Sequence, residues 1–131
     1  WPEEQETLRF GILGSQGVFE SAKEMIRALP NSEKFILYHI DESLSENVLN
    51  ELSLLYVGNQ THLEIRKISK ELDDLPVLLV GSQSNFLENG GIVNFVDNNG
   101  RTAFEINLTR SNQVGISFRA KLLRLALRII K

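Results

Sequence analysis

Residues 8–17 read LRFGILGSQG, an apolar run that ends in glycines. The glycines are spaced three residues apart: Gly11, Gly14 and Gly17. A dinucleotide-binding fingerprint needs two glycines separated by one residue, and a Walker A loop needs a Gly-Lys pair, and neither is present here. The stretch therefore predicts a turn from a strand to a helix, with Ser15 or Gln16 close enough to touch a ligand.

The same alternation of strand and helix continues along the chain. Strands are expected at residues 8–13, 34–40, 54–57 and 76–80, and helical segments at 18–29, 41–52 and 59–72. The run at 76–80, PVLLV, is wholly apolar, which is typical of a strand at the centre of a sheet. This order predicts a Rossmann-like α/β fold with a parallel sheet of about four strands and right-handed crossovers.

The pattern changes after residue 90. Residues 92–96 and 102–108 predict a β-hairpin around Asn99-Gly100, a pair that supplies the positive φ angles of a tight turn. Gly90-Gly91 before it suggests a bend or a close backbone approach. Residues 117–131 predict a terminal helix with Ser117 as its N-cap. We expect residues 1–131 to form a single domain.

Composition bounds the possible functions. The chain has 131 residues, 42% of them hydrophobic and none of them cysteine, so disulfides, zinc–thiolate sites and thiol catalysis are excluded. No apolar run approaches the roughly 18 residues of a membrane span. The chain begins at Trp1 without an initiator methionine, so we expect that a signal or anchor segment is absent from it.

Charge is distributed unevenly. The net charge of the chain is −3, but residues 110–131 contain no acidic residue. The basic residues of this segment are Arg110, Arg119, Lys121, Arg124, Arg128 and Lys131. Because no aromatic residue is interleaved for base stacking, the charges are expected to form the solvated face of a helix, and no nucleic-acid partner is expected.

Residues that could carry out catalysis are sparse. His39 and His62 lack the spacing of a metal site, and no Gly-x-Ser-x-Gly motif occurs. We therefore expect no catalytic residue, no metal, no cofactor and no enzymatic activity.

A binding site is still compatible with the expected fold, because ligands in open α/β sheets bind beyond the carboxyl ends of the strands. Short polar residues that suit a neutral ligand are expected there. The candidate ligand-binding residues are Ser15, Gln16, Asn59, Ser82 and Gln83. A small-molecule or nucleotide-binding α/β domain is therefore one alternative for the function.

The expected strand at residues 102–108 has two different faces. Phe104, Ile106 and Leu108 share an apolar face that should be core, whereas Glu105 and Asn107 point the other way. These two polar residues would be solvated, contact the following loop or bind a partner protein.

The sequence from residue 90 to 108, GGIVNFVDNNGRTAFEINL, and the segment VGISFRAKLLRLA at 114–126 resemble the YfiR-like family of bacterial periplasmic proteins. Trp1-Pro2, the GILG of residues 11–14 and Phe86 extend the resemblance over essentially the whole chain. Two features depart from the family pattern. Gly81-Ser82 stands where many members have an acid, and the family's first helix, before Trp-Pro, is missing.

The resemblance implies a non-catalytic periplasmic regulator that binds a membrane-bound diguanylate cyclase and so lowers cyclic-di-GMP and biofilm formation. The alternative that it implies is the extracytoplasmic sensor domain of a histidine kinase. Phe86, Glu105 and Asn107 are the candidate partner-binding residues.

Self-association is expected from the last segment. On a helix over 117–131, a second apolar stripe containing Leu123, Leu127 and Ile130 would lie beside the stripe that packs on the sheet. We expect these residues to form a homodimer contact, unless residues 1–7 or 109–116 cover the stripe within one monomer.

Overall fold

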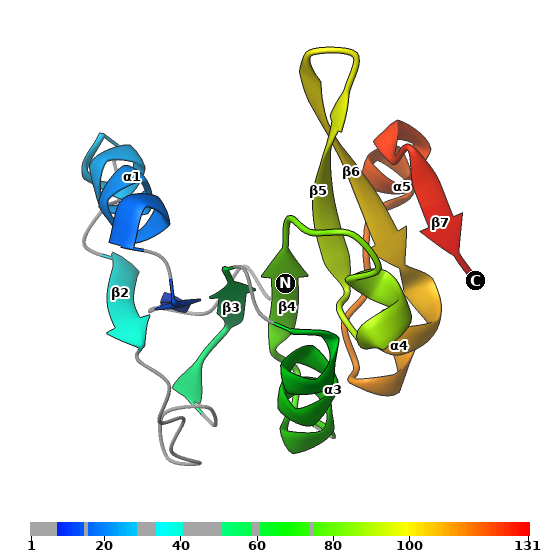
Figure 1. Cartoon of the computed structure of the whole chain (residues 1–131), viewed down its shortest axis with the longest axis horizontal. Helices are drawn as coiled ribbons and strands as arrows, with labels where there is room; N and C mark the ends of the chain where they lie inside the picture. The colour runs from blue at the N-terminus through cyan, green and yellow to red at the C-terminus, as the bar shows by residue number, and fades with distance from the viewer. Residues whose placement is uncertain (1–7, 15, 29–33, 41–50, 59–60, 74) are drawn as a thin grey trace.

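The computed structural model describes residues 8–14, 16–28, 34–40, 51–58, 61–73 and 75–131. Figure 1 shows how its helices and strands are arranged. Their bounds in chain order are β1 Leu8–Leu13, α1 Gln16–Arg27, β2 Phe35–Ile40, β3 Leu54–Val57, α3 His62–Glu71, β4 Leu78–Gly81, the 3₁₀ turn η2 Leu87–Asn89, β5 Val93–Asn98, β6 Arg101–Asn107, α4 Leu108–Gln113, α5 Ala120–Leu125 and β7 Arg128–Ile130.

The strands of the described residues form one sheet in the order β2-β1-β3-β4-β5-β6-β7. Strands β1 to β5 run parallel, β6 is antiparallel to β5, and β7 is parallel to β6. The predicted α/β fold with a parallel sheet is confirmed. The predicted hairpin is also present as β5 and β6, and it extends the same sheet, because β5 pairs with β4.

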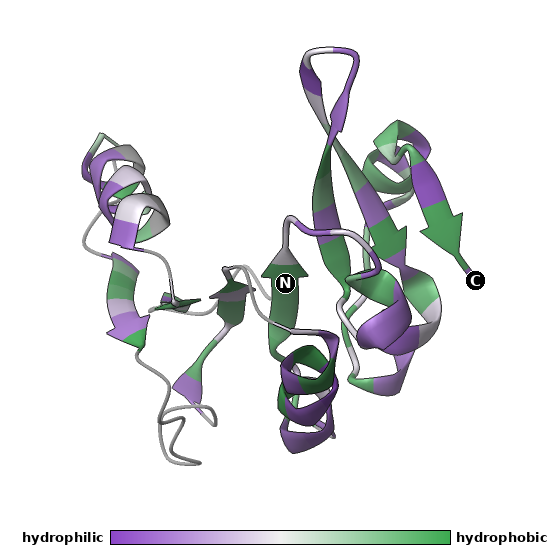
Figure 2. Cartoon of the chain, in the orientation of Figure 1, coloured by the Kyte–Doolittle hydropathy of each residue, from purple (hydrophilic) through white to green (hydrophobic). Residues whose placement is uncertain are grey.

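The core lies between the central strands and helix α3. Leu55 on β3 and Leu79 on β4 are 0% and 2% exposed, and Ile65 on α3 is 0% exposed. Ile65 and Ile68 lie three residues apart, so they share the face of α3 that packs on the sheet. Figure 2 shows β4 as hydrophobic over most of its length, as expected for a central strand.

Phe86 anchors the connection between β4 and β5 in this core. Its side chain is 0% exposed, and its ring lies against the backbone of Gly81 and Gly91, where any added Cβ would collide with it. Gly90 turns the chain with a φ of 109°, in the region that favours glycine. Gly90-Gly91 therefore provides both the bend and the close backbone approach that were expected.

The glycines of residues 8–17 have different structural roles. A Cβ on Gly11 would press against the side chains of Ile40 and Leu52, whereas Gly14 turns the chain after β1 with a φ of 79°. Gly17 has open space where its Cβ would be. Helix α1 begins at Gln16, so the predicted turn from a strand to a helix is confirmed.

The last segment differs from the predicted helix over 117–131. Helix α5 covers only Ala120–Leu125, Arg119 rather than Ser117 is its N-cap, and Arg128–Ile130 form β7. The prediction was wrong because β7 hydrogen-bonds to β6, and pairing of this kind outweighs the helical spacing of the leucines. The β-branched Ile129 and Ile130 also favour a strand.

This correction removes the two stripes that were expected on one helix. Leu123 lies on α5 and is half-buried, Leu127 follows α5 and is 51% exposed, and Ile130 lies on β7, where it packs against the core. A further difference is helix α4, in which Leu108 begins a helix instead of ending a strand.

Candidate functional site

A polar hollow of about 310 Å³ lies beside the carboxyl end of β4. The loop after β4 forms one wall, and β5 with one residue of β6 forms the other. Its lining residues are Ser82, Gln83, Ser84, Asn85, Asn94, Phe95, Val96, Asp97 and Glu105. The hollow therefore has the position at which open α/β sheets bind ligands.

Asn94 holds the two walls together. Its side chain is 3% exposed, its Oδ1 accepts a hydrogen bond of 3.0 Å from the Gln83 backbone N–H, and its Nδ2 donates one of 3.0 Å to the Gln83 carbonyl. The Tyr56 hydroxyl on β3 and Ser82 Oγ are also hydrogen-bonded, at 2.5 Å. These bonds fix the loop after β4, so the hollow is formed before any ligand arrives.

The structure brings together some of the predicted site residues. Ser82, Gln83 and Glu105 line the same hollow, although Glu105 was assigned to a partner surface rather than to the ligand site. Gln16 lies on α1, where its Nε2 donates to Glu20 Oε1 at 2.8 Å, and it is not part of the hollow. The predicted residues Ser15 and Asn59 lie outside the described residues.

Two carboxylates line the hollow, and both already have partners. Asp97 Oδ1 accepts from the Gly100 N–H at 3.0 Å, within the hairpin turn. Glu105 Oε2 accepts from Arg128 Nε at 3.0 Å, and this hydrogen bond raises the pKa of Arg128 above its ordinary value. The hollow therefore offers amides, hydroxyls, the Glu105 carboxylate paired with Arg128 and the Asp97 carboxylate held by a backbone N–H, a set rich in groups that can hydrogen-bond to a ligand.

Phe86 and Asn107 do not lie on a partner surface, which corrects the assignment made from the sequence. Phe86 is fully buried, and Asn107 is 9% exposed. Asn107 caps α4, because its Oδ1 accepts a hydrogen bond of 3.0 Å from the Arg110 N–H. Its Nδ2 donates a hydrogen bond of 3.1 Å to the Leu87 carbonyl. From the sequence, Asn107 could be solvated, contact the following loop or bind a partner, and the structure shows contact with the following segment.

An apolar surface surrounds α5. Leu122, Leu125 and Leu127 are 40%, 67% and 51% exposed. Beside them lies a mainly apolar groove of about 250 Å³, formed by Leu78, Ile116, Ser117, Phe118, Arg119 and Leu122. Of the predicted dimer residues, only Leu127 is exposed on this surface.

Within the part of the chain that the structure describes, no three His, Cys, Asp or Glu side chains gather in positions that could hold a metal ion. None of the helices in that part has the length and apolarity required to cross a bilayer.

A family model described as YfiR/HmsC-like matches residues 1–127. The chain belongs to the YfiR/HmsC-like family. YfiR/HmsC-like proteins are regulatory, non-catalytic domains that are periplasmic in general and interact with membrane signalling proteins. No curated protein matches the sequence.

Solved structures share the fold of this YfiR/HmsC-like domain. One is the crystal structure of a conserved domain protein from Vibrio cholerae O1 biovar El Tor, with a TM-score of 0.68 and 13% identity over 92% of this chain. Another is the ABC domain from Streptococcus pneumoniae in complex with L-Trp, with a TM-score of 0.67 and 13% identity over 94% of this chain. The matches span 54% and 56% of those two chains, so this domain corresponds to about half of each.

Sequence reasoning missed the part of Asn94 and Arg128 in building the hollow. Asn94 is a polar residue at an inward position of β5, where it is buried. A buried polar side chain needs hydrogen-bond partners, and Asn94 finds them in the backbone of the loop after β4. Arg128 could be paired with Glu105 only once residues 128–130 were known to form a strand.

Proposed function

We propose that this domain is a bacterial periplasmic regulator that restrains a membrane-bound diguanylate cyclase by protein–protein contact, and thereby lowers cyclic-di-GMP and biofilm formation. The observation that carries this proposal is the YfiR/HmsC-like family match over residues 1–127. A regulator of this kind needs a stable contact surface, but it needs no reactive side chains.

The surface around α5 supports a protein-facing role. Leu122, Leu125 and Leu127 expose apolar side chains next to β7, which is an edge strand of the sheet. Exposed apolar patches on soluble domains commonly mark interaction sites. In this proposal the surface is the contact between two copies of the chain, so the regulator acts as a homodimer.

A second candidate is ligand sensing, as in an extracytoplasmic sensor domain of a histidine kinase. The hollow at the carboxyl end of β4 favours it, because Ser82 and Gln83 line a preformed site of about 310 Å³. A solved structure of the same fold holds L-Trp, although its 13% identity transfers only the fold. Binding of a small neutral molecule there would be compatible with regulation of a cyclase.

The test of the main proposal compares bacteria with and without the full-length gene product. Deletion should raise the cellular cyclic-di-GMP level and surface attachment, and expression of the native protein should reverse both. A Ser82→Ala variant separates the two candidates, because a contact regulator would still complement the deletion. If deletion left cyclic-di-GMP unchanged, regulation of a diguanylate cyclase would be excluded.

A further inference from the structure

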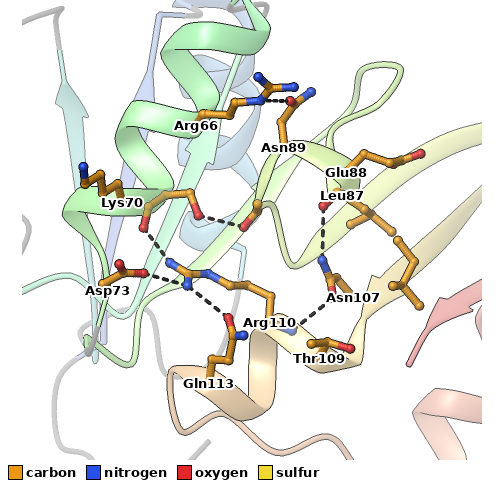
Figure 3. A pocket seen from close by; sticks show the side chains of 13 residues that line it. Arg66, Lys70, Asp73, Leu87, Glu88, Asn89, Asn107, Thr109, Arg110 and Gln113 are labelled. Carbon is orange, nitrogen blue, oxygen red and sulfur yellow. Dashed lines mark hydrogen bonds and ion pairs between the residues drawn. The ribbon is translucent and has the colours of Figure 1, made fainter.

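A second hollow, of about 570 Å³, lies between α3, η2 and α4 (Figure 3), and it shares no lining residue with the strand-end hollow, the one at the carboxyl end of β4. The lining residues of the second hollow come from four separate segments of the chain: 66–73, 87–90, 107–113 and Ile130 on β7. Three basic side chains, Arg66, Lys70 and Arg110, line it together with two acids, Asp73 and Glu88. Three basic and two acidic side chains give this lining a net charge of +1, whereas the whole chain has a net charge of −3.

Arg110 is a fixed part of the wall. It forms an ion pair of 2.7 Å with Asp73. It also donates a hydrogen bond of 3.2 Å to Gln113 Oε1 and another hydrogen bond to the Ser69 carbonyl. Its side chain is only 15% exposed. The bond to Ser69 joins α4 to α3, the ion pair reaches Asp73 just beyond α3, and the bond to Gln113 lies within α4 (Figure 3). The charge of Arg110 is therefore largely neutralised by Asp73, and the residue shapes the site.

Glu88 is likewise engaged outside the hollow. One of its carboxylate oxygens lies 3.4 Å from Arg128 on β7. Asp73 pairs with Arg110, and Glu88 shares Arg128 with Glu105, so Arg66 and Lys70 are the charged lining side chains that have no ion-pair partner among the described residues.

Arg66 and Lys70 lie four residues apart on α3, so they occupy the same side of the helix. Arg66 Nε donates a hydrogen bond of 2.5 Å to Asn89 Oδ1. Asn89 Nδ2 in turn donates a hydrogen bond of 2.8 Å to the Asn85 carbonyl. Asn89 is 5% exposed, so it orients the guanidinium through a neutral partner and leaves its positive charge in place. Among the described residues, no carboxylate forms an ion pair with Arg66 or Lys70.

We infer that this hollow binds a small anion that carries a carboxylate or phosphate group. The anion would accept hydrogen bonds from the Arg66 guanidinium and the Lys70 ammonium, which are donors suited to such groups. The Thr109 hydroxyl and the Gln113 amide line the same hollow and offer further donors. The site is independent of the proposed contact regulation, since it shares no residue with the α5 surface.

The test is a titration of the folded domain, followed by amide NMR shifts, with sodium phosphate in one arm and sodium citrate in the other. Sodium chloride keeps the ionic strength constant, because screening alone would otherwise mimic binding. We expect saturable shifts that are largest around residues 69–73 and 109–113. Saturation by phosphate alone, or by citrate alone, supports the site and identifies the preferred anionic group.

Two variants and one control make the result decisive. Arg66→Gln and Lys70→Gln should each raise the Kd about tenfold, the effect of losing a charge-assisted hydrogen bond. Lys67→Gln is the control, because Lys67 is exposed on the same helix and does not line the hollow. Shifts that do not saturate with either anion would overturn the inference, as would equal weakening by Lys67→Gln.

Discussion

Arg128 on β7 and Glu105 on β6 lie side by side, with 3.0 Å between Nε and Oε2, and Arg128 also reaches Glu88 at 3.4 Å. The pair joins an edge strand of three residues to the rest of the sheet. Glu105 is thereby assigned to holding the C-terminal strand, in addition to lining the strand-end hollow. A partner protein that contacts Glu105 directly would have to compete with Arg128.

Substituting Glu105→Gln should therefore lower the free energy of unfolding by about 1 kcal/mol or less, because Arg128 is nearly half exposed. The hydrogen bond to Glu105 raises the pKa of Arg128, so on the alkaline side the contribution of the pair is lost only in strong alkali, as the pH rises through the pKa of Arg128.

The measurement is a double-mutant cycle in urea with Glu105→Gln, Arg128→Gln and both together. We expect coupling between the two substitutions, whereas additive effects would show that the pair contributes nothing. Glu105→Lys should be more harmful than Glu105→Gln, because it places two cations together.

The packing of Phe86 between two glycines makes a second prediction. Gly81→Ala and Gly91→Ala should each destabilise the fold by roughly 1–3 kcal/mol, since the added methyl group would overlap the buried ring. Gly17→Ala is the matched control, because nothing lies within 4 Å of its Cβ position, and helix propensity makes it neutral or stabilising. Thermal denaturation of the three variants measures the difference. Equal melting temperatures for Gly91→Ala and the native domain would refute the close packing.

Asn107 gives a third prediction, because it both caps α4 and satisfies the Leu87 carbonyl. Asn107→Ala should cost about 1–2 kcal/mol of stability through loss of the cap and of a buried hydrogen bond. Asn112→Ala, at an exposed position of the same helix, should leave stability almost unchanged. Chemical denaturation compares the two, and a similar small effect for both would contradict the capping role.

The exposed leucines around α5 give a fourth prediction. If this surface joins two copies of the chain, Leu125→Glu and Leu127→Glu should convert a dimer to a monomer, because each places a charge in an apolar contact. Leu63→Glu is the control, since Leu63 is 76% exposed on α3, away from α5. Light scattering gives the mass in each case. A native domain that stays monomeric at high micromolar concentration would exclude the dimer.

Local sequence patterns were sufficient to predict much of the fold. The apolar run of β4 and the Asn99-Gly100 turn could be predicted because they depend on neighbouring residues. Residues 117–131 could not, because a strand at Arg128 depends on pairing with Glu105, 23 positions away. A helical spacing of leucines carries no information about that distant partner.

The same limit applies to the candidate sites. The position of Ser82 and Gln83 at a strand end followed from the rule for parallel sheets, and these residues do line a hollow. Burial of Phe86 and Asn107 could not be predicted, because it depends on how the loop after β4 folds back over Gly81. The hollow beside Arg66 and Lys70 was missed because it brings α3 next to α4, which is nearly 40 residues further along the chain.

The most direct test of the proposed function is the rate of cyclic-di-GMP formation by the membrane-bound diguanylate cyclase of the same bacterium. The cyclase is assayed in detergent with GTP, and the purified domain is added at increasing concentration. We predict a saturable fall in the rate, no consumption of GTP by the domain alone, and an unchanged fall with the Leu63→Glu control. A cyclase rate that stays constant at saturating domain, or turnover of GTP by the domain itself, would contradict the proposal of a non-catalytic regulator.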